Sequence, residues 1–347
     1  MPTEVRVSQL MGRGQQLSHL ERDLKAAETL ALWSSAGENS QDLDDPELIQ
    51  ILDYIRSLRD SKQRFAQVLR RTIDQLLDGE NTGRYSWDTL YKTERTHAGT
   101  LVEINLQREF LFADGGPMDY RIQGIDVDCK YSQNFGSWMI PPEAIGHLCL
   151  LVWADDQRSR WRAGMMRIKP EWLNSGSNRD RKSTITSGHR DKIQWLWPAE
   201  DCALPENVLL RLPPQDIEAI FASTSGQHRV TELFRRAQHR PISRNVVRTV
   251  AQQKDYMKRV RGNGGARSAL AHEGILIMGD YRSHQEIAQS LGLPAPREGE
   301  FVSARVTPGE SHPDSPSVCI DGQRWTLAHP GDQVTAAPGL PSTAKEK

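Results

Sequence analysis

Three residues in the first half of the chain have the types and spacing that phosphodiester hydrolysis requires. Asp119 lies two positions after Pro117, Asp128 follows nine residues later, and Lys130 two residues after that. Carboxylate oxygens suit Mg²⁺, which takes one or two protein carboxylates and keeps several waters. The ion would polarise a phosphoryl oxygen and lower the pKa of a bound water. A lysine on the same strand face could orient that water and offset charge in the transition state.

The same spacing has a plain alternative, because charged residues that alternate along a strand often form only a solvated face. Two details favour a site. The charged face lies among apolar residues and precedes an apolar run, and Glu103 supplies a further carboxylate in an otherwise apolar stretch. Asp126 shares the face of Asp128. It ranks below Asp128, as a supporting residue, an alternative ligand or a solvated side chain.

The clearest strand spans residues 125–131, where Asp126, Asp128 and Lys130 point to one side and apolar residues to the other. A continuous apolar run at 146–154 is typical of a strand buried on both faces. The remaining expected strands are its neighbour at 162–168, and 101–105 and 120–123, each a strand or a helix-to-strand junction.

Apolar residues recur at three- and four-residue spacing over 46–77, which predicts one long or two shorter amphipathic helices. With the strands, they predict an α/β core in which helices flank a mixed sheet. The expected divisions are a polar, partly helical N-terminal extension over 1–45, a catalytic domain over 46–204, a mostly helical domain over 205–320, and a flexible tail over 321–347, rich in Pro, Ser, Thr and Gly.

A strongly basic segment is hidden by the near-neutral net charge of −1. Residues 226–268 hold eleven Lys and Arg against two acids, a net charge of +9. Such asymmetry is typical of nucleic-acid binding. Helices expected at 216–223 and 231–237, followed by a basic helix at 245–260, indicate a helix-turn-helix or winged-helix module.

Two groups of basic and amide side chains are candidates for contact with DNA phosphates and base edges. For any single residue, a solvated surface is an equally good interpretation. The first group lies on the polar loop 174–192 and comprises Arg179, Arg181, Lys182 and Arg190. The second group lies in the basic segment and comprises Arg244, Arg248, Lys254, Lys258, Arg259, Arg261 and Asn263.

Several longer runs resemble the NaeI family of type IIE restriction endonucleases. The matching runs are TIDQLLDGENTGR, KTERTHAGTLVEINLQREF and MDYRIQGIDVDCKYS, and the resemblance continues through LNSGSNRDRKSTI and RGNGGARS. It covers about residues 45–320. Carried over by position, the family's PD-(D/E)xK active site falls on Glu103, Asp119 and Asp128 as metal-binding carboxylates, with Lys130 as the lysine.

The resemblance implies an N-terminal nuclease domain and a C-terminal helix-turn-helix domain. It also implies a homodimer that uses Mg²⁺ and binds two copies of a palindromic double-stranded site, one cleaved and one acting as effector. If specificity is shared as well, that site is GCCGGC. Two alternatives stay open: a strand-nicking nuclease of the mismatch-repair kind, and a DNA-binding regulator without catalysis.

Other classes of protein are disfavoured. No apolar run is long enough to span a membrane and no secretory signal is recognisable, so we expect a cytoplasmic protein. The four cysteines are scattered and the ten histidines form no HxH or HExxH group, which disfavours a zinc site. The turn at 262–265 lacks the GK[ST] of a nucleotide-binding loop, so no nucleotide cofactor is expected.

Overall fold

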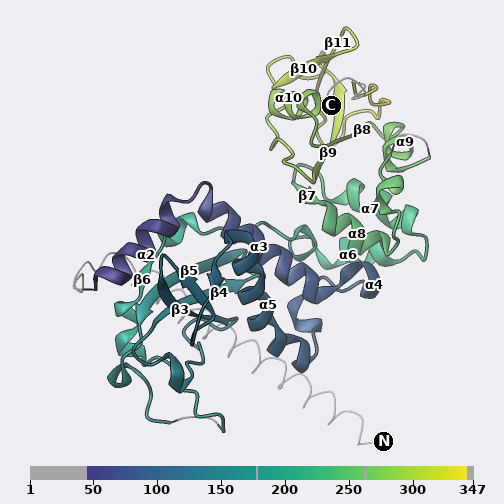
Figure 1. Cartoon of the computed structure of the whole chain (residues 1–347). Coiled ribbons are helices and arrows are strands. Elements are labelled where there is room, and N and C mark those ends of the chain that lie inside the picture. The colour runs from purple at the N-terminus through teal and green to yellow at the C-terminus, as the bar shows by residue number, and fades with distance from the viewer. Residues whose placement is uncertain (1–44, 177–178, 262–263, 342–347) are drawn as a thin grey trace, which may run out of the picture. The chain divides into compact units, whose positions relative to one another are not determined.

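The computed structural model describes residues 45–176, 179–261 and 264–341 (Figure 1). These residues form two compact units. The first contains residues 45–69 and 97–204, and the second contains residues 70–96 and 205–341. The predicted catalytic domain is continuous over 46–204, whereas the structure groups 70–96 with the second unit. The predicted extension over 1–45 lies outside the described residues, apart from Asp45.

A six-stranded mixed sheet forms the centre of the first unit. Its strands follow one another in chain order, and only β3 and β4 are parallel. The strand β4 is buried on both faces, as its unbroken apolar run predicts. The strands are β1 (Ala113–Asp114), β2 (Tyr120–Ile122), β3 (Ile125–Ser132), β4 (Leu148–Asp155), β5 (Arg160–Arg167) and β6 (Gln194–Trp195).

Two helices replace the single long one that the 46–77 pattern also allowed. Asp45 caps the first by accepting from the Leu48 backbone N–H at 3.1 Å, and Pro46 supplies a preformed first turn. Asp60, at φ 52°, separates the two. They are α2 (Pro46–Ser57) and α3 (Ser61–Leu77).

Residues 101–105 lie in the middle of helix α5 (Lys92–Phe110), so their interpretation as a strand was wrong. Ala98, Val102, Leu106 and Phe110 recur every four residues and form the buried stripe of this helix. Phe110 packs on Phe65 of α3, with ring centroids 4.7 Å apart. Tertiary burial of this stripe outweighs the local preference of Val and Ile for strands.

The second unit combines helices with an antiparallel five-stranded sheet, which the expectation of a mostly helical domain did not include. Strand β9 pairs with β7, β8 and β11. The helices are α4 (Gly79–Thr82), α6 (Pro214–Phe221), α7 (Gly226–Arg236), α8 (Arg244–Ala251), α9 (Ala266–Ala271) and α10 (Arg282–Ser290). The strands are β7 (Ile242–Ser243), β8 (Ile275–Met278), β9 (Glu300–Pro308), β10 (Ser317–Ile320) and β11 (Gln323–Leu327).

Two further predictions for this unit were wrong. The basic helix predicted over 245–260 ends at Ala251, where Gln252 takes the left-handed conformation at φ 51° and closes the helix. Residues 323–327 of the expected tail are ordered, because they form β11, which pairs with β10 and β9 and buries Trp325 to 4% exposure.

Short 3₁₀ helices occur at Trp87–Thr89, Pro142–Ala144, Pro170–Trp172, Ser187–Lys192, Ala199–Asp201, Val208–Leu210 and Tyr256–Arg259. Within the described ranges, no helix is both long and apolar enough to cross a membrane.

Candidate active site

The sheet and helix α5 bring all four predicted catalytic residues together. Asp119 immediately precedes β2, and its Oδ2 accepts from the Cys129 backbone N–H of β3 at 2.8 Å. Lys130 Nζ donates to Asp119 Oδ2 at 3.2 Å and to Asp128 Oδ1 at 2.8 Å. Glu103, on α5, interacts electrostatically with the same three side chains.

The four side chains carry more negative than positive charge. Burial, and then Asp119, raise the pKa of Glu103 to about 7, against the opposing effect of Lys130. Burial also raises the pKa of Asp128 to about 6, although Lys130 opposes it. Burial opposes the charge of Lys130, but Asp128 and Asp119 outweigh it and raise the pKa of the ammonium. We call these four residues the acidic cluster.

The acidic cluster fits a hard divalent cation. Three carboxylates share one ammonium, so a cation would offset both the burial and the mutual repulsion that raise the pKa values of Glu103 and Asp128. Over the described ranges, no three His, Cys, Asp or Glu side chains form a ready-made metal cage. A Mg²⁺ ion would need only one or two protein carboxylates and would fill its other positions with water and substrate oxygens.

Two contacts at the cluster were not found from the sequence. The Tyr120 hydroxyl donates to the Glu103 backbone carbonyl at 2.7 Å and ties α5 to β2. The Cys149 thiol, on β4, lies 3.7 Å from Asp128 Oδ2. Neither contact has a signal in the sequence, because each joins elements whose pairing is set by the tertiary fold.

Asp126 lies apart from the acidic cluster. Its Oδ1 accepts from the Gly116 backbone N–H at 3.2 Å and from Arg121 Nε at 3.1 Å. Arg121 lowers the pKa of Asp126. Asp126 therefore fastens the turn that leads into Asp119.

The loop residues predicted to contact DNA differ in their exposure. Arg179 and Arg181 are exposed, whereas Lys182 and Arg190 are half-buried. Arg190 donates to the Gly136 carbonyl at 3.3 Å, and burial lowers its pKa. Bridges of Ile140 to Ser183 and of Leu173 to Ile185 fasten this loop to the unit, so it is less free than its composition predicts.

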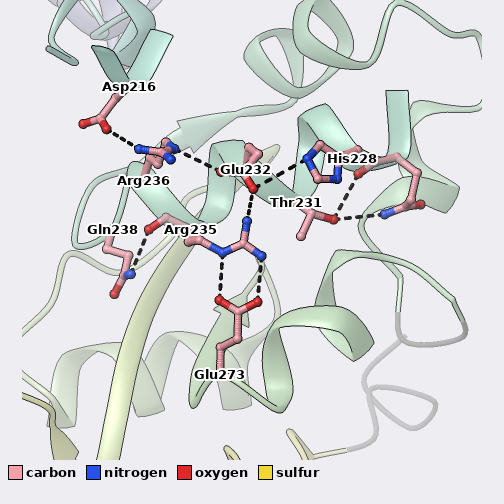
Figure 2. Close-up of polar contacts among 9 residues, drawn as sticks. Asp216, His228, Thr231, Glu232, Arg235, Arg236, Gln238 and Glu273 are labelled. Carbon is pink, nitrogen blue, oxygen red and sulfur yellow. Dashed lines mark hydrogen bonds and ion pairs between the residues drawn. The ribbon is translucent and has the colours of Figure 1, made fainter. Parts of the chain in front are cut away.

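In the second unit, much of the basic segment is neutralised by acids (Figure 2). Glu232 accepts from Arg235 and, at 3.0 Å, from Arg236 Nε. Arg235 also binds both carboxylate oxygens of Glu273 at 2.6 and 2.7 Å. Arg236 donates to Asp216 at 2.6 Å. We call these five residues the α7 network.

Most of the predicted DNA contacts in this unit also have acidic partners. Arg244 pairs with Asp280 at 3.0 Å, Arg248 with Glu80 at 3.3 Å, and both Lys258 and Arg259 with Asp255 at 3.6 and 3.4 Å. Lys254 and Arg261 are exposed, and no ion pair involves either within the part of the chain that the structure describes. Asn263 lies outside the described residues.

Comparison with known proteins identifies the family of this chain. The family model for restriction endonuclease NaeI matches residues 50–336. The chain is also 48% identical over 308 residues to the type II restriction enzyme NaeI of Lentzea aerocolonigenes, which covers 87% of this chain and 96% of that protein. The match includes the whole acidic cluster and most of the second unit. The chain belongs to the NaeI restriction endonuclease family.

Proposed function

We propose that the protein is a site-specific type II endonuclease that hydrolyses both strands of DNA with Mg²⁺. The observation that carries the proposal is Lys130 held between Asp119 and Asp128 beside the half-buried Glu103. This is the residue set and order of a PD-(D/E)xK site. The residue types are complete, which argues against a regulator that kept the fold and lost catalysis.

Each residue of the acidic cluster has a separate part in this proposal. Asp119 and Asp128 would bind Mg²⁺, with Glu103 as a further ligand, and the ion would polarise the phosphate and acidify a bound water. Lys130 stays protonated and fixes a positive charge between the two aspartates. That charge can orient the water and offset charge that develops on the phosphoryl oxygens. The Cys129 backbone N–H donates to Asp119 Oδ2 and holds that carboxylate beside β3.

We further propose that the second unit is a winged-helix DNA-binding domain. The order α7, β7, α8, α9, β8, β9, in which β7 and β8 both pair with β9, matches that of a winged helix and supports the proposal. In this interpretation α8 and α9 form the helix-turn-helix. The exposed Lys254 and Arg261 lie on the segment that joins them and are the first candidates for phosphate contact.

The family resemblance carries the rest of the proposal. The enzyme would act as a homodimer, recognise GCCGGC, and depend on a second copy of the site bound as effector by the winged-helix domain. Such coupling requires two distinct DNA sites and different contacts in two states. The four cysteines of the protein are free thiols, which suits a reducing cytoplasm.

The test is cleavage of a supercoiled plasmid with two GCCGGC sites, in Mg²⁺ and in EDTA, beside the Lys130→Ala protein. We expect discrete linear fragments that need both the metal and Lys130. Open circles without linear product would show a nicking enzyme. Cleavage by Lys130→Ala would refute the site, and an intact plasmid with DNA binding retained would favour another target or the non-catalytic regulator.

A further inference from the structure

A buried thiol lies against the most buried carboxylate of the acidic cluster. Cys149 on β4 is directly opposite Asp128 in the parallel pairing of β3 with β4. The two residues are 0% and 4% exposed, so water does not compete for their contact. The distance from Cys149 Sγ to Asp128 Oδ2 is 3.7 Å, which is within reach of a weak hydrogen bond from sulfur.

The two oxygens of Asp128 have different partners. Oδ1 accepts from the Lys130 ammonium at 2.8 Å, a strong charge-assisted hydrogen bond. Oδ2 faces the thiol, a weak donor. Cys149 is fully buried and packs in an apolar core, where a thiol keeps its proton and can act as the donor.

We propose that Cys149 is a positioning residue, whose thiol orients Asp128 Oδ2 for the divalent cation. This inference rests on the proposed Mg²⁺-dependent function. A weak donor suits the task, because it fixes the carboxylate plane and leaves lone-pair density on the oxygen for the metal. Partners that orient a metal ligand in this way commonly affect metal affinity when they are removed.

Packing alone is the competing explanation. Cys149 belongs to a hydrophobic core that includes Met118, Leu151 and Met166. A pure packing role predicts that loss of sulfur volume lowers stability and leaves cation affinity unchanged. An orienting role predicts that a hydroxyl in place of the thiol rescues the affinity that alanine loses.

The chain offers a matched control. Cys202 is also buried, at 1% exposure, and its Sγ lies 3.2 Å from the Pro198 carbonyl, with no carboxylate as acceptor. Cys202→Ala therefore removes a buried thiol and one sulfur hydrogen bond without touching the acidic cluster. Any effect on cation affinity that Cys149→Ala shows and Cys202→Ala does not is specific to the contact with Asp128.

The experiment is Ca²⁺ titration calorimetry on the full-length protein without DNA. We expect Cys149→Ala to weaken Ca²⁺ binding about threefold to tenfold, the scale of one lost hydrogen bond. Cys149→Ser and Cys202→Ala should bind Ca²⁺ with an affinity within about twofold of that of the unchanged protein. The inference is overturned if Cys149→Ala binds Ca²⁺ as tightly as the unchanged protein does. It is also overturned if Cys149→Ala and Cys149→Ser lose the same affinity. No Ca²⁺ binding to the unchanged protein would instead count against the proposed function.

A second measurement covers the case in which Cys149→Ala fails to fold. The S–H stretching band in the infrared spectrum shifts to lower frequency when the thiol donates a hydrogen bond. We expect Asp128→Asn to move the Cys149 band, assigned by its absence from Cys149→Ser. A band that does not respond to Asp128→Asn overturns the inference.

Discussion

The acidic cluster and the α7 network both place carboxylates beside cations, yet their charges are arranged in opposite ways. In the acidic cluster, three carboxylates share the single ammonium of Lys130, and burial with Asp119 raises the pKa of Glu103 to about 7. In the α7 network, Glu273 forms a two-pronged pair with Arg235, which lowers the pKa of Glu273. In the acidic cluster, three carboxylates depend on one cation, whereas in the α7 network each of the three carboxylates pairs directly with at least one of two arginines.

This difference indicates that the acidic cluster is suited to bind a ligand, whereas the α7 network stabilises the fold. A cluster with excess negative charge is less stable by itself and gains from a cation, which is how functional sites commonly perturb pKa values. The α7 network already supplies an arginine partner for each of its carboxylates, and it ties α7 to Asp216 and Glu273. Charge counted along the sequence cannot separate the two, because the acids that neutralise residues 226–268 come largely from outside that segment.

Asp119→Asn should have the largest effect. It removes a carboxylate that faces Lys130, and we expect cleavage to slow by at least about 10²–10³-fold under single-turnover conditions. DNA affinity measured in Ca²⁺ should change far less. Asp126→Asn is the control, since Asp126 contacts Gly116 and Arg121 rather than Lys130. If Asp126→Asn were as slow as Asp119→Asn, the boundary of the acidic cluster would need to be redrawn.

Glu232→Gln should cost the most stability. It leaves Arg235 and Arg236 without the carboxylate that both share, and we expect a loss of about 1–3 kcal/mol in the free energy of unfolding by urea. The matched control is Glu286→Gln, on the exposed Arg282–Glu286 pair of α10, where we expect less than about 0.5 kcal/mol. Equal losses in both variants would mean that the α7 network contributes no more than a surface pair.

Glu103→Gln should raise the stability of the metal-free protein, whereas Glu232→Gln lowers it. The folded pKa of Glu103 lies above its usual value of 4.5, at about 7, so this carboxyl prefers its protonated form when folded. Its contribution to stability is present at low pH and is lost as pH rises from about 4.5 through 7. Because Glu103 is partly solvated, we expect Glu103→Gln to gain only about 1–2 kcal/mol at pH 8 and almost nothing at pH 4.

The measurement is thermal unfolding in EDTA across this pH range. Saturating Mg²⁺ should cancel the gain or reverse it, because the unchanged protein is then stabilised by the bound cation. A pH-independent difference between the two proteins would contradict the excess charge assigned to the acidic cluster.

Local periodicity was enough to predict much of the sheet in the first unit. Alternation over 125–131 places Asp128 and Lys130 on one face of β3, and the apolar run gives the buried β4. The helix that carries Glu103 was mistaken for a strand, since Val102 and Ile104 favour strands locally while their burial depends on α3 and the sheet. The contact of Cys149 with Asp128 depends on the register of two parallel strands, which no local pattern encodes.

The second unit was harder to predict because its determinants are long-range. No Gly or Pro marks the end of α8 at Ala251, where Gln252 turns the chain. The sheet pairs β7 with the distant β9, and Trp325 of the supposed tail becomes part of a core. The arginines of α7 are typical of a DNA-binding surface. Only the fold shows that Arg235 pairs with Glu273 and Arg236 with Asp216.

The smallest expected effect concerns Lys254 and Arg261, the exposed cations of residues 226–268 for which the described residues provide no ion pair. If the second unit binds DNA through phosphates, Lys254→Ala and Arg261→Ala should each reduce the slope of log binding constant against log salt by about 0.9. Stability should not change, because neither residue takes part in an ion pair among the described residues.

Arg236→Ala is the control and should do the reverse. It should lower stability with little change in slope, since the charge of Arg236 is already paired with Glu232 and Asp216. Fluorescence anisotropy over a salt series, in a Lys130→Ala background that prevents cleavage, measures all three. A larger slope change for Arg236→Ala than for Lys254→Ala would show that the α7 network opens to DNA, and the contrast between matched and unmatched charge would then fail in this unit.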